Sequence, residues 1–72
     1  MHILLIEPDD AKAEASKKGL RCATGVLVTR AKTMEEAGEL FQAANGGRDK
    51  QRFTHVKRGT LLIAAGQFFK KT

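Results

Sequence analysis

The apolar pattern of this chain changes its period at Thr33, and that change constrains the fold more than any other feature. Residues 26–31 are β-branched and apolar at their start, which is typical of a β-strand. Thr33 and Glu36 then have the spacing of a capping box, in which the threonine hydroxyl accepts from an amide of the first helical turn. The sequence therefore predicts a strand that leads directly into a helix over residues 34–44.

One face of this predicted helix is apolar. Ala37, Leu40, Phe41 and Ala44 recur at the spacing of a single stripe on a helix of 3.6 residues per turn. Such a stripe has to face a sheet. The Asn-Gly-Gly run at 45–47 predicts the end of the helix, because these residues tolerate the left-handed conformation common there.

The first part of the chain predicts a second strand and leaves one segment open. Residues 2–7 carry apolar side chains on both faces, as a central strand does. Pro8 ends this predicted strand because it has no backbone amide to donate. Residues 10–18 are either a short helix, capped by Asp9 or Asp10, or a loop.

Two more strands are expected near the C-terminal end. Residues 52–57 and 60–69 are predicted to form a hairpin that turns at Arg58 and Gly59. Gly66 is expected to mark a bulge in the second of these strands.

Together these elements predict an α+β fold in one domain over residues 1–72. It is a small two-layer sandwich, in which a mostly antiparallel sheet of about four strands packs on the 34–44 helix. Strands one, two and four are expected to pair around that helix, and residues 70–72 to form a flexible tail. The predicted core is Ile3, Leu5, Val26, Val28, Leu40, Phe41, Val56, Leu61, Ile63 and Phe68.

The net charge of +5 is concentrated after residue 45. Residues 1–45 hold six basic and seven acidic residues, whereas residues 46–72 hold seven basic residues and one acid. A basic stripe attracts phosphates, acidic protein surfaces or anionic lipid. The predicted binding residues are Arg48, Lys50, Arg52, Lys57, Arg58, Lys70 and Lys71.

Phe53, Phe68 and Phe69 are interleaved with these charges and leave two alternatives open. Exposed rings would stack on bases while the cations bind phosphates. Buried rings would leave a solvated charged face. The chain has no RNP, zinc-finger or basic-zipper signature, and the 34–44 helix begins with acids that repel DNA. Any nucleic acid is therefore expected at the hairpin and the loop before it.

No motif for catalysis, metal or cofactor binding is visible in the sequence. Ser16 is the only serine and has no histidine near it in sequence, and His2, Cys22 and His55 lack ligand spacing. We therefore expect a non-enzymatic protein without a cofactor. The single cysteine, the lack of a long apolar run and the strand directly after Met1 predict a soluble, cytoplasmic protein without a signal peptide or membrane contact.

Residues 4–10, LLIEPDD, followed by the strand at 26–31 and by Glu-Glu-Ala at 35–37, resemble the first half of a bacterial response-regulator receiver domain. The resemblance implies that Asp9 and Asp10 hold magnesium, as the acidic pair of that family does. The family also needs a phosphoacceptor aspartate after its third strand, and no Asp follows position 49 here. The alternative is that the pair caps a helix on a solvated turn.

Over its whole length, the chain resembles very small phage and mobile-element proteins, including some anti-CRISPR proteins. The resemblance rests on V-x-x-A-x-T-x-E-E-A at 28–37, which leads from a strand into one helix, and on the terminal hairpin. It implies a non-catalytic inhibitor that docks stoichiometrically on a larger host protein or ribonucleoprotein complex with an anionic surface. The alternatives are a direct nucleic-acid binder and a homodimeric module that pairs along its fourth strand.

Overall fold

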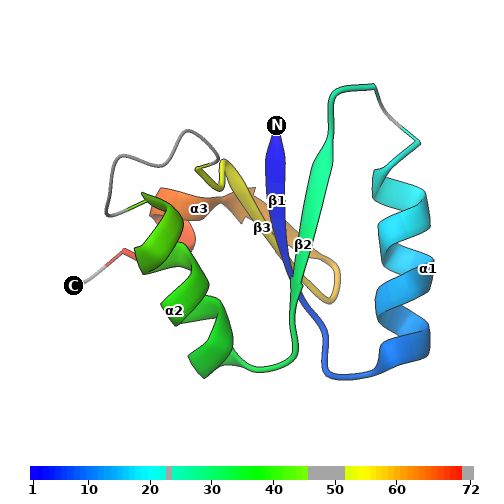
Figure 1. The fold of residues 1–72 in the computed structure, drawn as a ribbon, viewed down its shortest axis with the longest axis horizontal. Helices are drawn as coiled ribbons and strands as arrows, with labels where there is room; N and C mark the ends of the chain where they lie inside the picture. Colours follow the sequence, from blue (N-terminus) through cyan, green and yellow to red (C-terminus); the bar gives the residue numbers. More distant parts are fainter. Residues whose placement is uncertain (23, 46–51, 71–72) are drawn as a thin grey trace.

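The computed structural model describes residues 1–22, 24–45 and 52–70, which form one mixed sheet with helices on both of its faces. Along the chain the elements are β1 (His2–Ile6), α1 (Asp10–Leu20), β2 (Leu27–Ala31), α2 (Met34–Asn45), β3 (His55–Arg58), β4 (Leu61–Ala64) and α3 (Ala65–Phe68). The sheet lies between α1 on one side and α2 with α3 on the other (Figure 1).

The strand order in the sheet is β2-β1-β3-β4. β1 runs parallel to both β2 and β3, and only the β3–β4 hairpin is antiparallel. The predicted α+β fold, with one main helix on a four-stranded sheet, is confirmed. The predicted mostly antiparallel sheet is wrong. Each of the connections β1-α1-β2 and β2-α2-β3 uses a helix to carry the chain back along the sheet, so the next strand runs in the same direction as the one before it. Of the expected pairing of the first, second and fourth strands, the pairing of the first two is confirmed and that of the fourth is wrong, since β3 separates β4 from β1.

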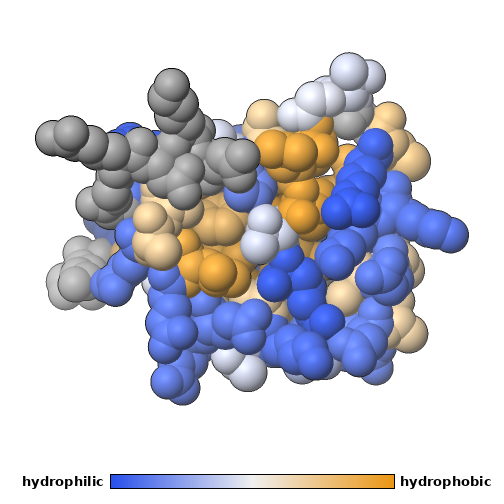
Figure 2. All heavy atoms as spheres, viewed as in Figure 1, coloured by the Kyte–Doolittle hydropathy of each residue, from blue (hydrophilic) through white to orange (hydrophobic). Residues whose placement is uncertain are grey.

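β1 is the centre of the core because both of its faces are covered. Leu4 and Ile6 belong to the larger cluster, which lies between the sheet and α2. The other buried members of this cluster are Ala31, Ala37, Phe53, Val56 and Ala65. Ile3 and Leu5 point to the opposite face and are only 2% exposed, and Ala13 of α1 is buried as well. Figure 2 shows apolar side chains between α2 and the sheet, bordered by hydrophilic side chains along the loops at the lower edge.

The predicted core is confirmed in the strands that lie inside the sheet. Ile3, Leu5 and Val56 are buried. The partly buried members of the prediction are Val26, Val28, Leu40, Phe41, Ile63 and Phe68. Leu61 was wrongly assigned to the core: it is 46% exposed, because β4 is an edge strand.

The helix boundaries follow the capping residues. α2 begins at Met34 as predicted, and the Thr33 hydroxyl accepts from the amide of Glu36 at 3.1 Å. Residues 10–18, for which helix and loop were the alternatives, belong to the helix α1. Asp9 caps this helix by accepting from the amide of Lys12 at 2.9 Å. α1 continues to Leu20, beyond the expected limit at residue 18.

The expected strand over residues 60–69 is wrong after Ala64. The chain turns there into α3, and Gly66 lies in this helix and not in a bulge. The turn brings Phe68 and Phe69 against the core beside Phe41, which an extended strand would not do. The predicted loop at 46–51 and the end of the predicted tail, 71–72, lie outside the described residues.

Candidate functional site

The β3–β4 hairpin exposes two leucines at the edge of the sheet. Gly59 and Thr60 connect the strands, and Gly59 has a φ of 61°, which glycine adopts without strain. The turn places Leu61 opposite Arg58 and Leu62 opposite Lys57. Leu61 is 46% and Leu62 is 47% exposed. We call Lys57, Arg58, Leu61 and Leu62 the hairpin surface.

Each face of the hairpin surface combines one apolar side chain with one cation. Neighbouring strand residues point to opposite faces, so Arg58 and Leu61 share the α2 side while Lys57 and Leu62 share the α1 side. The Lys57 ammonium donates to the carbonyl of Gly59, which holds it beside the turn. In the described sheet β4 pairs with β3 alone, so the outer backbone groups of β4 are open to another chain.

The structure places only part of the predicted basic set on this surface. Lys57 and Arg58 are consecutive in β3, at the end where the turn begins. Arg52 is exposed and precedes β3, so it lies toward the other end of the strand. Lys70 is exposed and directly follows Phe69, which stacks on Phe41 of α2, so it lies away from the hairpin turn. The predicted residues Arg48, Lys50 and Lys71 lie outside the described residues.

The phenylalanines of the C-terminal part belong to the core. Phe53 is 5% exposed, and its ring lies 4.3 Å from that of His2. Phe69 stacks on Phe41 at 4.3 Å and meets the edge of Phe68 at 4.9 Å. Of the two alternatives for these rings, the core interpretation is confirmed. They therefore offer no flat exposed platform for stacking bases.

A cleft of about 620 Å³ opens at the carboxyl ends of the three parallel strands. It is bounded by residues that end or follow β1, β2 and β3: Ile6, Glu7, Pro8, Lys32, Thr33, Met34, Arg58, Gly59 and Thr60. The loop after β1 leads to α1 on one face of the sheet, while the loop after β2 leads to α2 on the other (Figure 1). Adjacent loops that diverge in this way leave a crevice, which is the usual ligand position in open α/β sheets. We call it the strand-end cleft.

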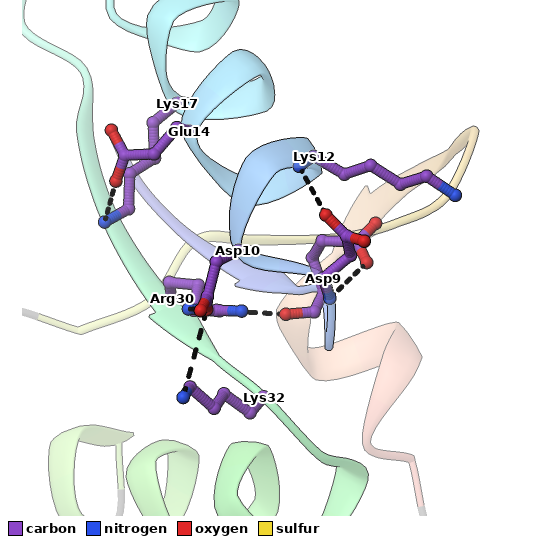
Figure 3. A network of polar contacts seen from close by, with 8 residues as sticks. Asp9, Asp10, Lys12, Glu14, Lys17, Arg30 and Lys32 are labelled. Atoms are coloured by element: carbon purple, nitrogen blue, oxygen red, sulfur yellow. Dashed lines mark hydrogen bonds and ion pairs between the residues drawn. The ribbon is translucent and has the colours of Figure 1, made fainter.

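The acidic pair beside the cleft is engaged by the protein itself (Figure 3). Asp9 caps α1, as the helix-cap interpretation predicted. Asp10 lies 2.7 Å from the guanidinium of Arg30 and 3.9 Å from the ammonium of Lys32. The hydrogen bond from Arg30 and the positive charges of Lys32 and Arg30 lower the pKa of Asp10. The residue that ends β3 is the cation Arg58.

The histidines and the cysteine lie apart and have protein partners. The His2 ring lies 2.7 Å from the Thr29 hydroxyl, and the Cys22 thiol lies 3.2 Å from the carbonyl of Lys18. His55 contacts the hydroxyl of the preceding residue at 3.0 Å. Among the described residues, no group of three or more His, Cys, Asp or Glu side chains is placed to hold a metal ion. In the same residues, no helix is long and apolar enough to cross a membrane.

Sequence reasoning missed the role of Asn45, the last residue of α2. Its side-chain amide donates to the carbonyl of Phe53 and its side-chain oxygen accepts from the amide of Phe53, both at 2.9 Å. The prediction relied on the tolerance of the 45–47 run for a left-handed backbone, whereas Asn45, like the other described non-glycine residues, has a negative φ. The signal for the observed role was the polarity of Asn at the end of an apolar stripe.

Comparisons with protein-family models, with curated proteins and with solved structures found no match to this chain.

Proposed function

We propose that this protein is a small, non-enzymatic binding protein that docks stoichiometrically on a larger cytoplasmic partner through the hairpin surface. It would be an inhibitor of the phage or mobile-element type that the sequence resembles. The observation that carries the proposal is the pair of exposed leucines on an unpaired edge strand, each opposite a cation. Exposed apolar groups at a sheet edge are a liability that proteins otherwise avoid, so their presence favours a binding role.

The chemistry of the hairpin surface also indicates the kind of partner. The outer backbone groups of β4 can pair with an extended strand, which supplies affinity through main-chain hydrogen bonds. Leu61 and Leu62 then add buried apolar contact, and Lys57 and Arg58 favour a partner with acidic side chains or phosphates around that strand. We therefore propose a protein or ribonucleoprotein partner with an accessible strand and an anionic surround.

A matched pair of leucine variants tests this proposal. Tagged wild-type protein, the double variant Leu61→Ser/Leu62→Ser and the control Leu27→Ser would be used to capture partners from extracts of the host cells. Leu27 is a suitable control because it is 56% exposed on β2, the other edge of the sheet. We expect the wild type and Leu27→Ser to retain the same partner in a one-to-one complex, measured by native mass spectrometry, and the double variant to lose it. Equal retention by all three proteins would contradict the proposal.

Direct nucleic-acid binding is the alternative function, and it predicts a different result. Phosphate neutralisation makes affinity fall steeply with salt and depends on Lys57 and Arg58 more than on the leucines. Titration with single-stranded and duplex DNA and RNA at low and near-physiological salt distinguishes the two. Micromolar, salt-sensitive binding that persists in Leu61→Ser/Leu62→Ser would favour the alternative.

A homodimer would use the same edge. Light scattering on the purified protein would then give a doubled mass that returns to the single-chain mass in Leu61→Ser/Leu62→Ser. A single-chain mass for the wild type would exclude this third function under the conditions of the measurement.

A further inference from the structure

We infer that the strand-end cleft is a binding site for a small organic phosphate of about the size of a nucleoside monophosphate. The cleft contains no residue of β4 and shares only Arg58 with the hairpin surface, so the inference does not depend on docking. Its starting point is the cleft itself, whose volume of about 620 Å³ falls within the usual range of small-molecule sites. It lies where the loops after β1 and β2 diverge to opposite faces of the sheet.

Two cations border the cleft from different strands. Arg58 is in register with Ile6, and Lys32 directly follows Ala31, which is in register with Ile6 on the other side. Two strand spacings separate β2 from β3, so the backbones of the two cations are about 10 Å apart. Arg58 lies on the α2 side of the sheet and Lys32, which pairs with Asp10, lies on the α1 side, so a phosphate bound past the end of β1 would lie between the two side chains. There Arg58 would act as a planar, bidentate donor and Lys32 as a point charge.

Lys32 is available for such a ligand. Its nearest anionic partner is Asp10 at 3.9 Å, the outer limit of an ion pair, and its side chain is 60% exposed. Exposed pairs of this kind contribute little, so rotating the ammonium toward the cleft costs little. Asp10 keeps its closer partner, Arg30, at 2.7 Å.

The remaining lining residues fit a phosphate that carries an organic group. Thr33 caps α2 and Met34 begins it, so the positive end of the helix dipole lies at the cleft, where it opposes the charges of Glu35 and Glu36 in the first turn. Met34 is 41% exposed and offers an apolar contact to the organic part of the ligand. The Glu7 carboxylate is the opposing charge, and it accepts from the amide of Asp9 at 2.9 Å. The charge from the lining side chains is +1, from Lys32, Arg58 and Glu7.

Amide chemical shifts measured by NMR test the inference directly. The protein would be titrated with adenosine 5′-monophosphate, with inorganic phosphate and with adenosine. We expect saturable shifts with the monophosphate in the approximately millimolar range or tighter, at the amides after β1, β2 and β3, weaker shifts with inorganic phosphate, and none with adenosine. The variants Lys32→Gln and Arg58→Gln should each weaken binding roughly tenfold, the loss expected for one charge-assisted hydrogen bond.

Lys18→Gln is the matched control, because it removes the same charge from an exposed residue near the C-terminal end of α1, and Lys18 does not line the cleft. It should leave phosphate binding unchanged. Equal weakening by Lys18→Gln, shifts that do not saturate, or shifts spread over all basic residues would overturn the inference. Two further results would show that the two sites act separately: normal partner capture by Lys32→Gln, and normal phosphate binding by Leu61→Ser/Leu62→Ser.

Discussion

The guanidinium of Arg30 on β2 lies 2.7 Å from the carboxylate of Asp10, the first residue of α1. The same side chain donates from Nε to the carbonyl oxygen of Glu7 at 2.8 Å (Figure 3). One arginine therefore holds the end of β1 and the start of α1 against β2. Its side chain is 15% exposed, whereas that of Asp10 is 78% exposed.

This contact predicts a pH-dependent stability. Arg30 lowers the pKa of Asp10 in the folded state, so the carboxylate stabilises the fold above the ordinary aspartate pKa of about 3.9. That contribution is lost as the pH falls through the lower, folded-state pKa. We expect Asp10→Asn to be less stable than the wild type in urea unfolding at pH 7, with a difference that shrinks below about pH 4. Glu14→Gln, which removes a pair at 3.7 Å whose carboxylate side chain is 73% exposed, is the control and should show little change. A constant difference for Asp10→Asn at all pH values would contradict this assignment.

Leu4 and Leu62 are expected to differ sharply in their effect on stability. Leu4 is fully buried, and its replacement by alanine should lower the free energy of unfolding by about 2 to 5 kcal/mol. Leu62 is 47% exposed, and Leu62→Ala should change it by no more than about 0.5 kcal/mol. Chemical unfolding of both variants provides the measurement. A large loss in Leu62→Ala would mean that this leucine serves the fold and not an interface.

Gly59 is expected to resist substitution for conformational reasons alone. A Cβ at this position meets no atom within 4 Å, but the φ of 61° is strained for other residues. Gly59→Ala should therefore lower the free energy of unfolding by about 1 to 2 kcal/mol. Gly38→Ala is the control, since Gly38 lies within α2 and also has open space around it. This control should raise stability by roughly 0.5 to 1 kcal/mol, so a loss in both variants would argue against the conformational explanation.

Asn45 is expected to order the entry to β3. Asn45→Ala removes both bonds to the backbone of Phe53 and should lower the free energy of unfolding by about 1 to 3 kcal/mol. Asn45→Asp keeps the acceptor but sets a carboxylate against the Phe53 carbonyl, so it should not restore stability. Faster hydrogen exchange of the Phe53 amide would report the loss directly. Gln42→Ala, at an exposed position of α2, should leave this exchange unchanged.

Local signals in the sequence predicted the helices better than the sheet. The change of period at Thr33 predicted the start of α2, and Asp9 was one of two predicted caps for α1. Strand direction depended on whether residues 10–18 form a helix, since only a long crossover makes β1 and β2 parallel. That segment buries Ala13 alone, so its apolar pattern is too weak to decide.

The candidate site was likewise predicted where local sequence signals decide and missed where tertiary contacts decide. Charge counting identified Lys57 and Arg58, but composition alone does not show that these two consecutive residues of β3 lie on opposite faces of the sheet. The leucines of β4 looked like core because their apolar run continues into α3. Phe68 and Phe69 pack against the core, with Phe69 stacked on Phe41 of α2, and the strand that precedes them ends at Ala64 with Leu61 and Leu62 at an exposed edge. The strand-end cleft joins three segments that are distant in sequence, so no local pattern indicates it.

The central position of β1 has a consequence for how the protein is made. Ile3 pairs with Val28 on one side and with His55 on the other, so β1 is translated well before the second of its two neighbouring strands. Until residues 55–58 leave the ribosome, one side of the apolar segment 3–6 has no partner strand. Closing such long-range contacts is slow, and exposed apolar strands in nascent chains attract chaperones. We therefore expect the chain to complete its folding only after synthesis of the hairpin, and truncation before residue 55 to leave it unfolded.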